Sequence, residues 1–417
     1  MENTHSVPVR SSVLNAAVLI AALGYFVDIY DLILFSIVRV PSLRSLGYEG
    51  ENLFSQGVVL LNCQMIGMLI GGIFWGILGD KRGRLSVLFG SILLYSIANV
   101  ANGLVQDVHS YALWRLIAGI GLAGELGAGI TLVAEVLPKE KRGYGTTIVA
   151  SVGICGALLA ANVAEHLDWR RAYFVGGGLG LCLLFLRIGV LESGLFEMVK
   201  ATAHRRGDFL SLFQSRSSFL KYLRCILIGV PVWYVVGILI TFSPEFAKAK
   251  GGTEPVSAGK AVMYCYLGMA IGDLASGLLS QALRSRKKVV LAFLALTTLG
   301  VLYYLHAPPL ESAQFYAVCC ALGFGGGYWA LFVTIATEQF GTDLRATVTI
   351  TVPNFVRGSV VPLTFLFISL RSRFGINGSA LFVGILSLSA AFLALWGLEE
   401  TFSKDLNYLE SRSEEAL

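Results

Sequence analysis

The chain has 417 residues, of which 55% are hydrophobic and only 14% are charged, and its formal net charge is +5. Soluble domains carry about 25% charged residues, so this composition excludes a soluble globular protein and indicates one that is solvated by a lipid bilayer. No basic run with interleaved aromatic residues is present, so we expect no nucleic-acid partner. The seven cysteines lie in or beside apolar stretches without metal-ligand spacing. We therefore expect buried thiols, and neither a metal nor another cofactor.

Apolar runs that can cross a membrane as helices follow one another along the chain. A spanning helix needs about 20 predominantly apolar residues, and these runs lack the alternating segments of a β-barrel. The first run follows a polar N-terminus and is too long for the apolar core of a signal peptide. We predict an all-α membrane protein with twelve transmembrane helices, near residues 12–38, 55–79, 85–105, 111–136, 144–165, 171–193, 222–244, 258–281, 288–306, 313–337, 346–370 and 377–398.

The positions of lysine and arginine predict the orientation of these helices. Most of these residues fall in loops on the same side of the predicted membrane as the N-terminus, and cytoplasmic loops are the ones enriched in them. We expect a multi-pass protein of the inner (cytoplasmic) membrane with both termini in the cytoplasm. The longest polar stretch between spans is residues 195–221. Phe209 and Phe213 within it predict either a short amphipathic helix on the membrane surface or a plain linker.

The chain consists of two copies of one unit. Residues 121–143 align with residues 324–346 without a gap, and the alignment places Glu125 opposite Tyr328. Internal repeats of this length are typical of transporters, in which the substrate site lies between the repeats. The same Glu-to-Arg spacing closes both segments, at Glu135 and Arg142 and at Glu338 and Arg345. We predict two six-helix bundles, a linker and a tail, at residues 1–194, 222–398, 195–221 and 399–417.

The turn between the second and third predicted helices has the sequence GILGDKRGR, residues 76–84. Gly76 permits close helix contact and Gly83 permits a tight turn. Asp80 can accept hydrogen bonds from exposed amides at a helix N-terminus, where the dipole favours its charge. This sequence resembles the signature loop of the major facilitator superfamily, which has a glycine, an acidic residue and basic residues around a second glycine. The corresponding turn of the second half has Gln281 in place of the acid.

Two further segments extend the resemblance. RLIAGIG (residues 115–121) and EVLPKEKRG (residues 135–143) resemble superfamily signatures in the fourth helix and at its exit. The resemblance implies the major facilitator fold, with twelve transmembrane helices in two pseudo-symmetric six-helix bundles. It also implies a cytoplasmic charge cluster that holds the halves together while the cavity faces outward. The residues expected in this conformational gate are Gly76, Asp80, Gly83, Arg84, Glu135, Arg142, Glu338 and Arg345.

Asp28 and Asp31 lie one helical turn apart in the first predicted helix, in the sequence DIYDL. Two carboxyl groups this close in a span disfavour the doubly charged state, so one of them can carry a proton. The segment resembles the Asp-Gly-Tyr/Phe-Asp-Leu of proton-driven transporters for aromatic acids, nicotinate-like compounds and other metabolites, with Ile29 in place of the glycine. The resemblance implies a proton-coupling role for Asp28, Asp31 and Arg115. A structural ion pair is the alternative for Asp28.

Arg357 is expected near the midpoint of the eleventh helix. A charge there costs at least about 2.5–3.5 kcal/mol, so the guanidinium needs a carboxylate, either from a substrate or from the protein. Snorkelling to the lipid edge is a third arrangement. Glu125 is too far from Arg115 along the fourth helix for a good ion pair, so it either faces the cavity or pairs across helices. The substrate-binding candidates are Arg357, Asn354, Glu125, Tyr328, Trp329, Tyr30, Gln64 and Tyr234.

These features predict a monomeric secondary active transporter that moves a small organic anion by alternating access, with protons as the coupling ion. A uniporter or exporter of a neutral sugar or drug-like compound is the alternative within transport. A transporter-like sensor that binds a ligand without moving it is the alternative outside transport. We do not expect an enzyme, because the sequence has neither a Walker loop nor a nucleophile and base at a recognisable spacing.

Overall fold

The computed structural model describes residues 16–82, 84–137, 139–192, 209–213, 215–252, 254–341 and 344–402, which form helices joined by short loops and contain no β-strand. Within these ranges, ten helical stretches are long and apolar enough to cross a membrane. The last of them, Thr347–Trp396, contains both of the final two predicted spans. The fourth predicted span is divided into two shorter helices. The predicted all-α membrane fold is confirmed.

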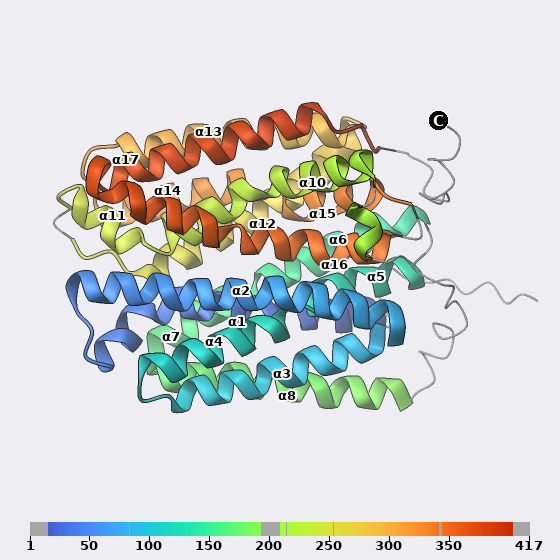
Figure 1. Cartoon of the computed structure of the whole chain (residues 1–417), viewed down its shortest axis with the longest axis horizontal. Coiled ribbons are helices and arrows are strands. Elements are labelled where there is room, and N and C mark those ends of the chain that lie inside the picture. Colours follow the sequence, from blue (N-terminus) through green and yellow to red (C-terminus); the bar gives the residue numbers. More distant parts are fainter. Residues whose placement is uncertain are drawn as a thin grey trace, which may run out of the picture.

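The helices form two halves that lie against each other as two layers (Figure 1). Both chain ends of the described region lie at one end of the molecule, which we call the terminal end; the other is the opposite end. The N-terminal half contains α1 (Ala16–Ser45), α2 (Gly50–Arg82), α3 (Arg84–Leu104), α4 (Val108–Leu122), α5 (Glu125–Val136), α6 (Lys139–Ile154), α7 (Gly156–His166) and α8 (Trp169–Glu192).

The C-terminal half follows a linker, of which residues 209–213 form a short 3-10 helix, η1 (Phe209–Phe213). The rings of Phe209 and Phe213 pack against Phe355 and Tyr222. The first helix of this half begins at Arg216, six residues before the predicted start of the seventh span. The half contains α10 (Arg216–Tyr234), the π-helix η2 (Val235–Ile240), α11 (Ser243–Ala249), α12 (Ala258–Ala282), α13 (Arg286–His306), α14 (Ser312–Gly326), α15 (Trp329–Glu338), α16 (Arg345–Gly358) and α17 (Val360–Trp396).

Polar side chains at the membrane ends define where helices begin. The Asp107 carboxylate accepts hydrogen bonds from the amides of His109 and Ser110 at 2.9 Å and so caps α4. Glu400 accepts from the amides of Arg286 and Lys287 at the start of α13, at 2.8 and 3.2 Å. Partial burial alone would raise the pKa of Glu400, but these hydrogen bonds and one from Ser285 lower it below its ordinary value.

Glycines allow the same pair of helices to pack closely in each half. A Cβ atom on Gly119 of α4 would collide with the carbonyl oxygen of Gln64 on α2. In the second half, a Cβ atom on Gly323 of α14 would collide with the carbonyl oxygen of Cys265 on α12. Small residues at such contacts let helix backbones approach each other in lipid. The sequence repeat is therefore visible as a repeated helix contact.

Two helix breaks at equivalent positions of the repeat place polar backbone inside the membrane. The first lies at Ala123 and Gly124, between α4 and α5, and the second lies at Gly327 and Tyr328, between α14 and α15. The alignment of the halves pairs Gly124 with Gly327. Broken helices at membrane depth are tolerated where protein or a cavity surrounds them. These breaks therefore mark the region where a site is to be sought.

Candidate functional site

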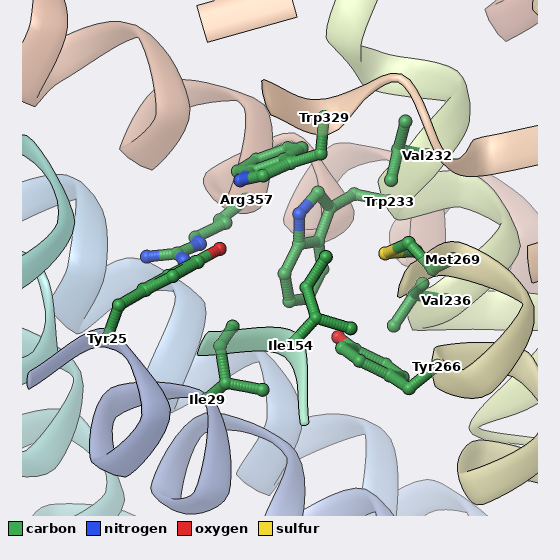
Figure 2. Close-up of a pocket in the computed structure, with 10 residues that line it drawn as sticks. All are labelled: Tyr25, Ile29, Ile154, Val232, Trp233, Val236, Tyr266, Met269, Trp329 and Arg357. Carbon is green, nitrogen blue, oxygen red and sulfur yellow. The ribbon is translucent and has the colours of Figure 1, made fainter. Parts of the chain in front are cut away.

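A small cavity with a free volume of about 10 Å³ lies between the two halves. This is about the space that one water molecule needs, so the cavity must widen to admit a substrate. Its walls are mostly apolar and aromatic, and among the described residues Arg357 is the one charged side chain that lines it (Figure 2). The N-terminal half contributes α1 and α6, and the C-terminal half contributes α10, η2, α12, α15 and α16. The lining residues are Tyr25, Ile29, Ile154, Val232, Trp233, Val236, Tyr266, Met269, Trp329 and Arg357. A ligand in this cavity would contact both halves at once.

Arg357 is only loosely compensated. It is 1% exposed, and its Nη2 atom lies 3.7 Å from Oδ2 of Asp28, which is an ion pair without a hydrogen bond. Its Nε and Nη2 atoms have no hydrogen-bond partner among the described residues. The guanidinium carbon lies 5.6 Å from the ring centre of Trp329 and 6.0 Å from that of Trp233. Figure 2 shows the guanidinium between the rings of Tyr25 and Trp329.

Asp28 and Asp31 are both fully buried in α1, and no carboxyl oxygen of either has a hydrogen-bond partner in the described part of the chain. Asp28 reaches across the boundary between the halves to Arg357. Asp31 stays within the N-terminal half, where it lies in the electrostatic field of both Asp28 and Arg115. The sequence places the two carboxyl groups together. The structure adds that only Asp28 approaches the cavity.

Glu125 and Arg115, two further buried charges of the N-terminal half, have their partners within that half. Glu125 binds Arg187 of α8, with Nη1 donating to Oε2 at 3.1 Å. This is the cross-helix pairing that was one of the two arrangements expected for Glu125. Arg115 donates to the side-chain oxygen of Gln64 and stacks on the Phe35 ring, with 4.7 Å between the guanidinium carbon and the ring centre. Neither Glu125 nor Arg115 lines the cavity.

Most of the other predicted substrate contacts are occupied by backbone hydrogen bonds. Of these candidates, Trp329 lines the cavity, whereas the tyrosines and Asn354 bind carbonyl oxygens of neighbouring helices. Asn354 is distinctive because its amide donates across the two halves, to the carbonyl oxygen that the first helix break exposes. The bonds run from Tyr30 to Ala172 at 2.9 Å, from Tyr234 to Ala380 at 2.7 Å, from Tyr328 to Ile228 at 2.9 Å and from Asn354 to Ala123 at 2.8 Å.

Comparison with known proteins agrees with this architecture. Residues 14–360 match the Major Facilitator Superfamily. The chain belongs to that superfamily. It is a transporter, not an enzyme.

Individual relatives of this superfamily member cover most of its length. It is 25% identical to the sialic acid transporter NanX of Escherichia coli (strain K12), over 91% of this chain and 92% of that protein. It is 24% identical to the niacin transporter NiaP of Acinetobacter baylyi, over 69% and 72%. The solved structure of the proton:xylose symporter XylE, bound to 6-bromo-6-deoxy-D-glucose, superposes with a TM-score of 0.68 at 18% identity, over 95% and 98% of the two chains.

Most of the predicted conformational gate lies outside what the structure describes. Gly83 is not among the described residues, and the side chains of Asp80, Arg84, Glu135, Arg142 and Arg345 are not described. Gly76 is buried, and a Cβ atom there would lie 3.6 Å from the methyl group of Thr351 in α16. Glu338 pairs with Arg286 of α13, with Oε1 3.1 Å from Nη2. That pair joins two helices of one half.

Sequence reasoning missed the opposite-end contact and one carboxyl group. Arg39 of α1 is fully buried and pairs with Glu245 of α11 at 2.7 Å, across the two halves. Arg39 lies one residue beyond the first predicted span, residues 12–38, so no buried role is expected for it from the sequence. Asp273 is fully buried in α12. The sequence could have identified Asp273, because a lone carboxylate in an apolar run such as MAIGDLASG indicates a functional position inside a membrane.

Proposed function

We propose that this transporter moves a small organic carboxylate across the membrane together with protons. The observation that carries the proposal is the buried, loosely compensated Arg357 on the wall of a cavity between the two halves. A guanidinium holds a carboxylate by two parallel hydrogen bonds, and Arg357 has unpartnered donors for such a pair. An uncharged substrate would not neutralise the buried guanidinium, so it would gain no binding free energy from the charge of Arg357.

The walls of the cavity favour a carboxylate that carries an apolar or ring-shaped body. Tyr25, Trp233, Tyr266 and Trp329 offer aromatic surface, which suits planar rings. A substrate with many hydroxyl groups needs polar partners that this lining does not supply. Two relatives are named for sialic acid and niacin, both of which are carboxylic acids, and this supports the charge of the proposed substrate.

Coupling to protons follows from competition for Arg357. Ionised Asp28 neutralises Arg357, and a substrate carboxylate must displace it. A proton on Asp28 removes the competing charge and frees the guanidinium. Proton binding and anion binding therefore strengthen each other, and this reciprocity is the thermodynamic basis of symport. We place both termini in the cytoplasm, as the loop charges predict, and the two halves then rock around the fixed site.

Uptake into liposomes tests this function directly. The purified protein is reconstituted, and labelled nicotinate and benzoate are offered with and without an alkaline interior. Nicotinamide and benzamide serve as matched neutral compounds of the same shape. Protein-free liposomes correct for passive accumulation of weak acids. We expect accumulation of at least one acid above the protein-free level, collapse of that accumulation by a protonophore, and no accumulation of the amides.

Other results assign the alternatives. Equal movement of acid and amide, without accumulation above equilibrium, would identify a uniporter. Binding of a compound without any movement would identify a sensor. Either result would contradict the proposed symport, and a wider panel of monocarboxylates would be required before a negative result with these two acids is counted against it.

A further inference from the structure

Asp273 caps a broken helix from outside that helix. It lies in α12, is fully buried, and its Oδ1 atom accepts a hydrogen bond from the amide of Ala330 at 3.1 Å. Ala330 is the second residue of α15, the helix that begins after the break at Gly327 and Tyr328. The Oδ2 atom has no hydrogen-bond partner in the described part of the chain. One carboxyl oxygen thus holds the helix start while the other is unpartnered.

Asp273 differs from the other buried carboxyl groups because it has no cation. In the described residues, no lysine, arginine or histidine nitrogen lies within 4.0 Å of it. The remaining buried carboxyl groups each lie near a guanidinium: Asp28 with Arg357, Glu125 with Arg187, and Asp31 in the field of Arg115. A buried, uncompensated carboxylate is strongly disfavoured in a membrane, and such a group becomes neutral by taking up a proton.

The described neighbours of Asp273 include no cation that could neutralise its carboxylate, so a proton is the remaining way to remove the charge. Of the ionisable groups on the packed helices, Tyr25 of α1 interacts with Asp273 electrostatically, as it does with Asp28 and Arg357. Helix α15 contributes the backbone amide of Ala330. Among the described residues, no ionisable side chain forms a hydrogen bond or an ion pair with Asp273.

We propose that Asp273 is a second proton-binding site, in the C-terminal half, and that α15 senses whether the site is loaded. The positive end of the α15 dipole attracts ionised Asp273 more strongly than protonated Asp273. A proton that enters from water when the cavity opens therefore weakens the hold on α15. Trp329, the first residue of α15, lines the cavity. Loading of Asp273 would in this way alter the substrate site, and the inference rests on the proton-coupled function proposed above.

Infrared difference spectroscopy of the purified protein tests the site without any substrate. The protonated carboxyl group gives a C=O stretching band, and spectra are recorded between acidic and alkaline pH. We expect Asp273→Asn to remove one pH-dependent component of that band, and Asp28→Asn to leave the same component in place. The asparagine introduced by Asp273→Asn retains a side-chain oxygen for the Ala330 amide, so the cap survives. Asp273→Glu should shift the component, which provides a second readout if Asp273→Asn does not fold.

An unchanged band in Asp273→Asn would show that Asp273 is a permanently ionised cap and would overturn the proposal. A transport measurement then tests coupling: with an acid that the parent accumulates, the number of protons moved per substrate should fall by one in Asp273→Asn, whereas an unchanged number would reject a coupling role. Failure of the proposed function is recognised separately, because it would appear as absent gradient-driven uptake in the parent protein while the infrared band still reports on Asp273.

Discussion

At the scale of single residues, the incomplete pairing of Arg357 determines what the cavity can bind. Its distance of 3.7 Å from Asp28 is too long for a hydrogen bond, and both residues are buried. If Asp28 were fully hydrogen-bonded to Arg357, the pair would be purely structural. If no carboxylate lay nearby, the free-energy cost of burying the guanidinium would be too high. The observed arrangement lies between these two limits. An incoming carboxylate can therefore exchange places with Asp28 at a modest free-energy difference.

Two replacements of Arg357 should show separately how its charge and its planar shape contribute to the affinity for the transported acid. Arg357→Ala should abolish measurable binding of the transported acid, since removal of one partner of a buried charged hydrogen-bonded pair costs about 2–5 kcal/mol. Arg357→Lys keeps the charge but loses the planar fork, so affinity should fall several-fold. Titration calorimetry of the purified variants provides both values. Parental affinity in Arg357→Ala would assign a structural role to the residue.

Replacement of Asp28 should uncouple transport from the proton that Asp28 carries. Asp28→Asn imitates the protonated side chain, so Arg357 is permanently free for a substrate carboxylate. Affinity for the acid should no longer rise as the pH falls, because the competing charge is absent at every pH. Exchange of labelled for unlabelled acid across the liposome membrane should survive, and accumulation driven by a pH gradient should fall well below the parental level, because at most the proton on Asp273 remains coupled. Accumulation at the parental level would transfer the coupling role to Asp273 or Asp31.

The sequence identifies buried charges better than it identifies their partners. Asp28 and Arg357 are evident as charged residues within apolar runs. Their pairing depends on how α1 and α16 are rotated in two different halves, and apolar helices that are hydrophobic on most faces give little rotational signal. The same limit applies to Glu125 and Arg187. The partners of hydroxyl groups are harder still to predict from the sequence. The Tyr234 hydroxyl, for example, donates to a backbone carbonyl on a neighbouring helix, and every residue has such a carbonyl.

At the scale of elements, the helix breaks recur at aligned positions of the two halves, but the sequence does not predict them. The aligned glycines Gly124 and Gly327 both lie at breaks, although the sequence alone predicts continuous spans there. The reason is that apolar composition continues through each break, and composition determines membrane insertion. The contact between α2 and α4 is similarly hidden, because Gly119 is one of 47 glycines in the chain. The structure shows which of them lie at close backbone contacts.

A methyl group at the contact between α2 and α4 should destabilise the N-terminal half. In Gly119→Ala the new Cβ atom would overlap the Gln64 carbonyl group, and overpacking of this kind costs about 1–3 kcal/mol. Gly178→Ala in α8 is the matched control, since a Cβ atom there meets nothing within 4 Å. The control should be neutral or stabilising by up to about 1 kcal/mol. Thermal unfolding of both variants in detergent measures the difference, and equal melting temperatures would contradict the assigned contact.

At the scale of the whole molecule, contacts between the halves lie on both sides of the cavity. Towards the terminal end, α16 packs on α2 and α5, where Ile350 fills the space beside Gly127. At the opposite end, Arg39 pairs with Glu245, and the hydroxyl groups of Ser36 and Thr241 lie 3.1 Å apart. Alternating access requires that these two sets of contacts open in turn. Because α10, η2 and α11 run from the cavity to Glu245, we expect bending at the π-helical turn η2.

A reversible cross-link at the opposite end tests whether that set of contacts must open. The Ser36 and Thr241 hydroxyl groups are hydrogen-bonded across the two halves, so their Cβ atoms should approach the separation of about 3.5–4.5 Å that a disulfide needs. In the double variant Ser36→Cys with Thr241→Cys, an oxidant should abolish uptake and a reductant should restore it. Each single variant controls for the seven native cysteines, which are all free, and should keep its activity under the same oxidant.

Full uptake by the oxidised double variant, with the cross-link verified by mass spectrometry, would show that α1 and the segment between η2 and α11 move as one body. The opening would then have to occur elsewhere, and the groove between α7 and α12, whose residues Glu165 and Lys260 pair at 3.4 Å across the halves, would be the next place to cross-link.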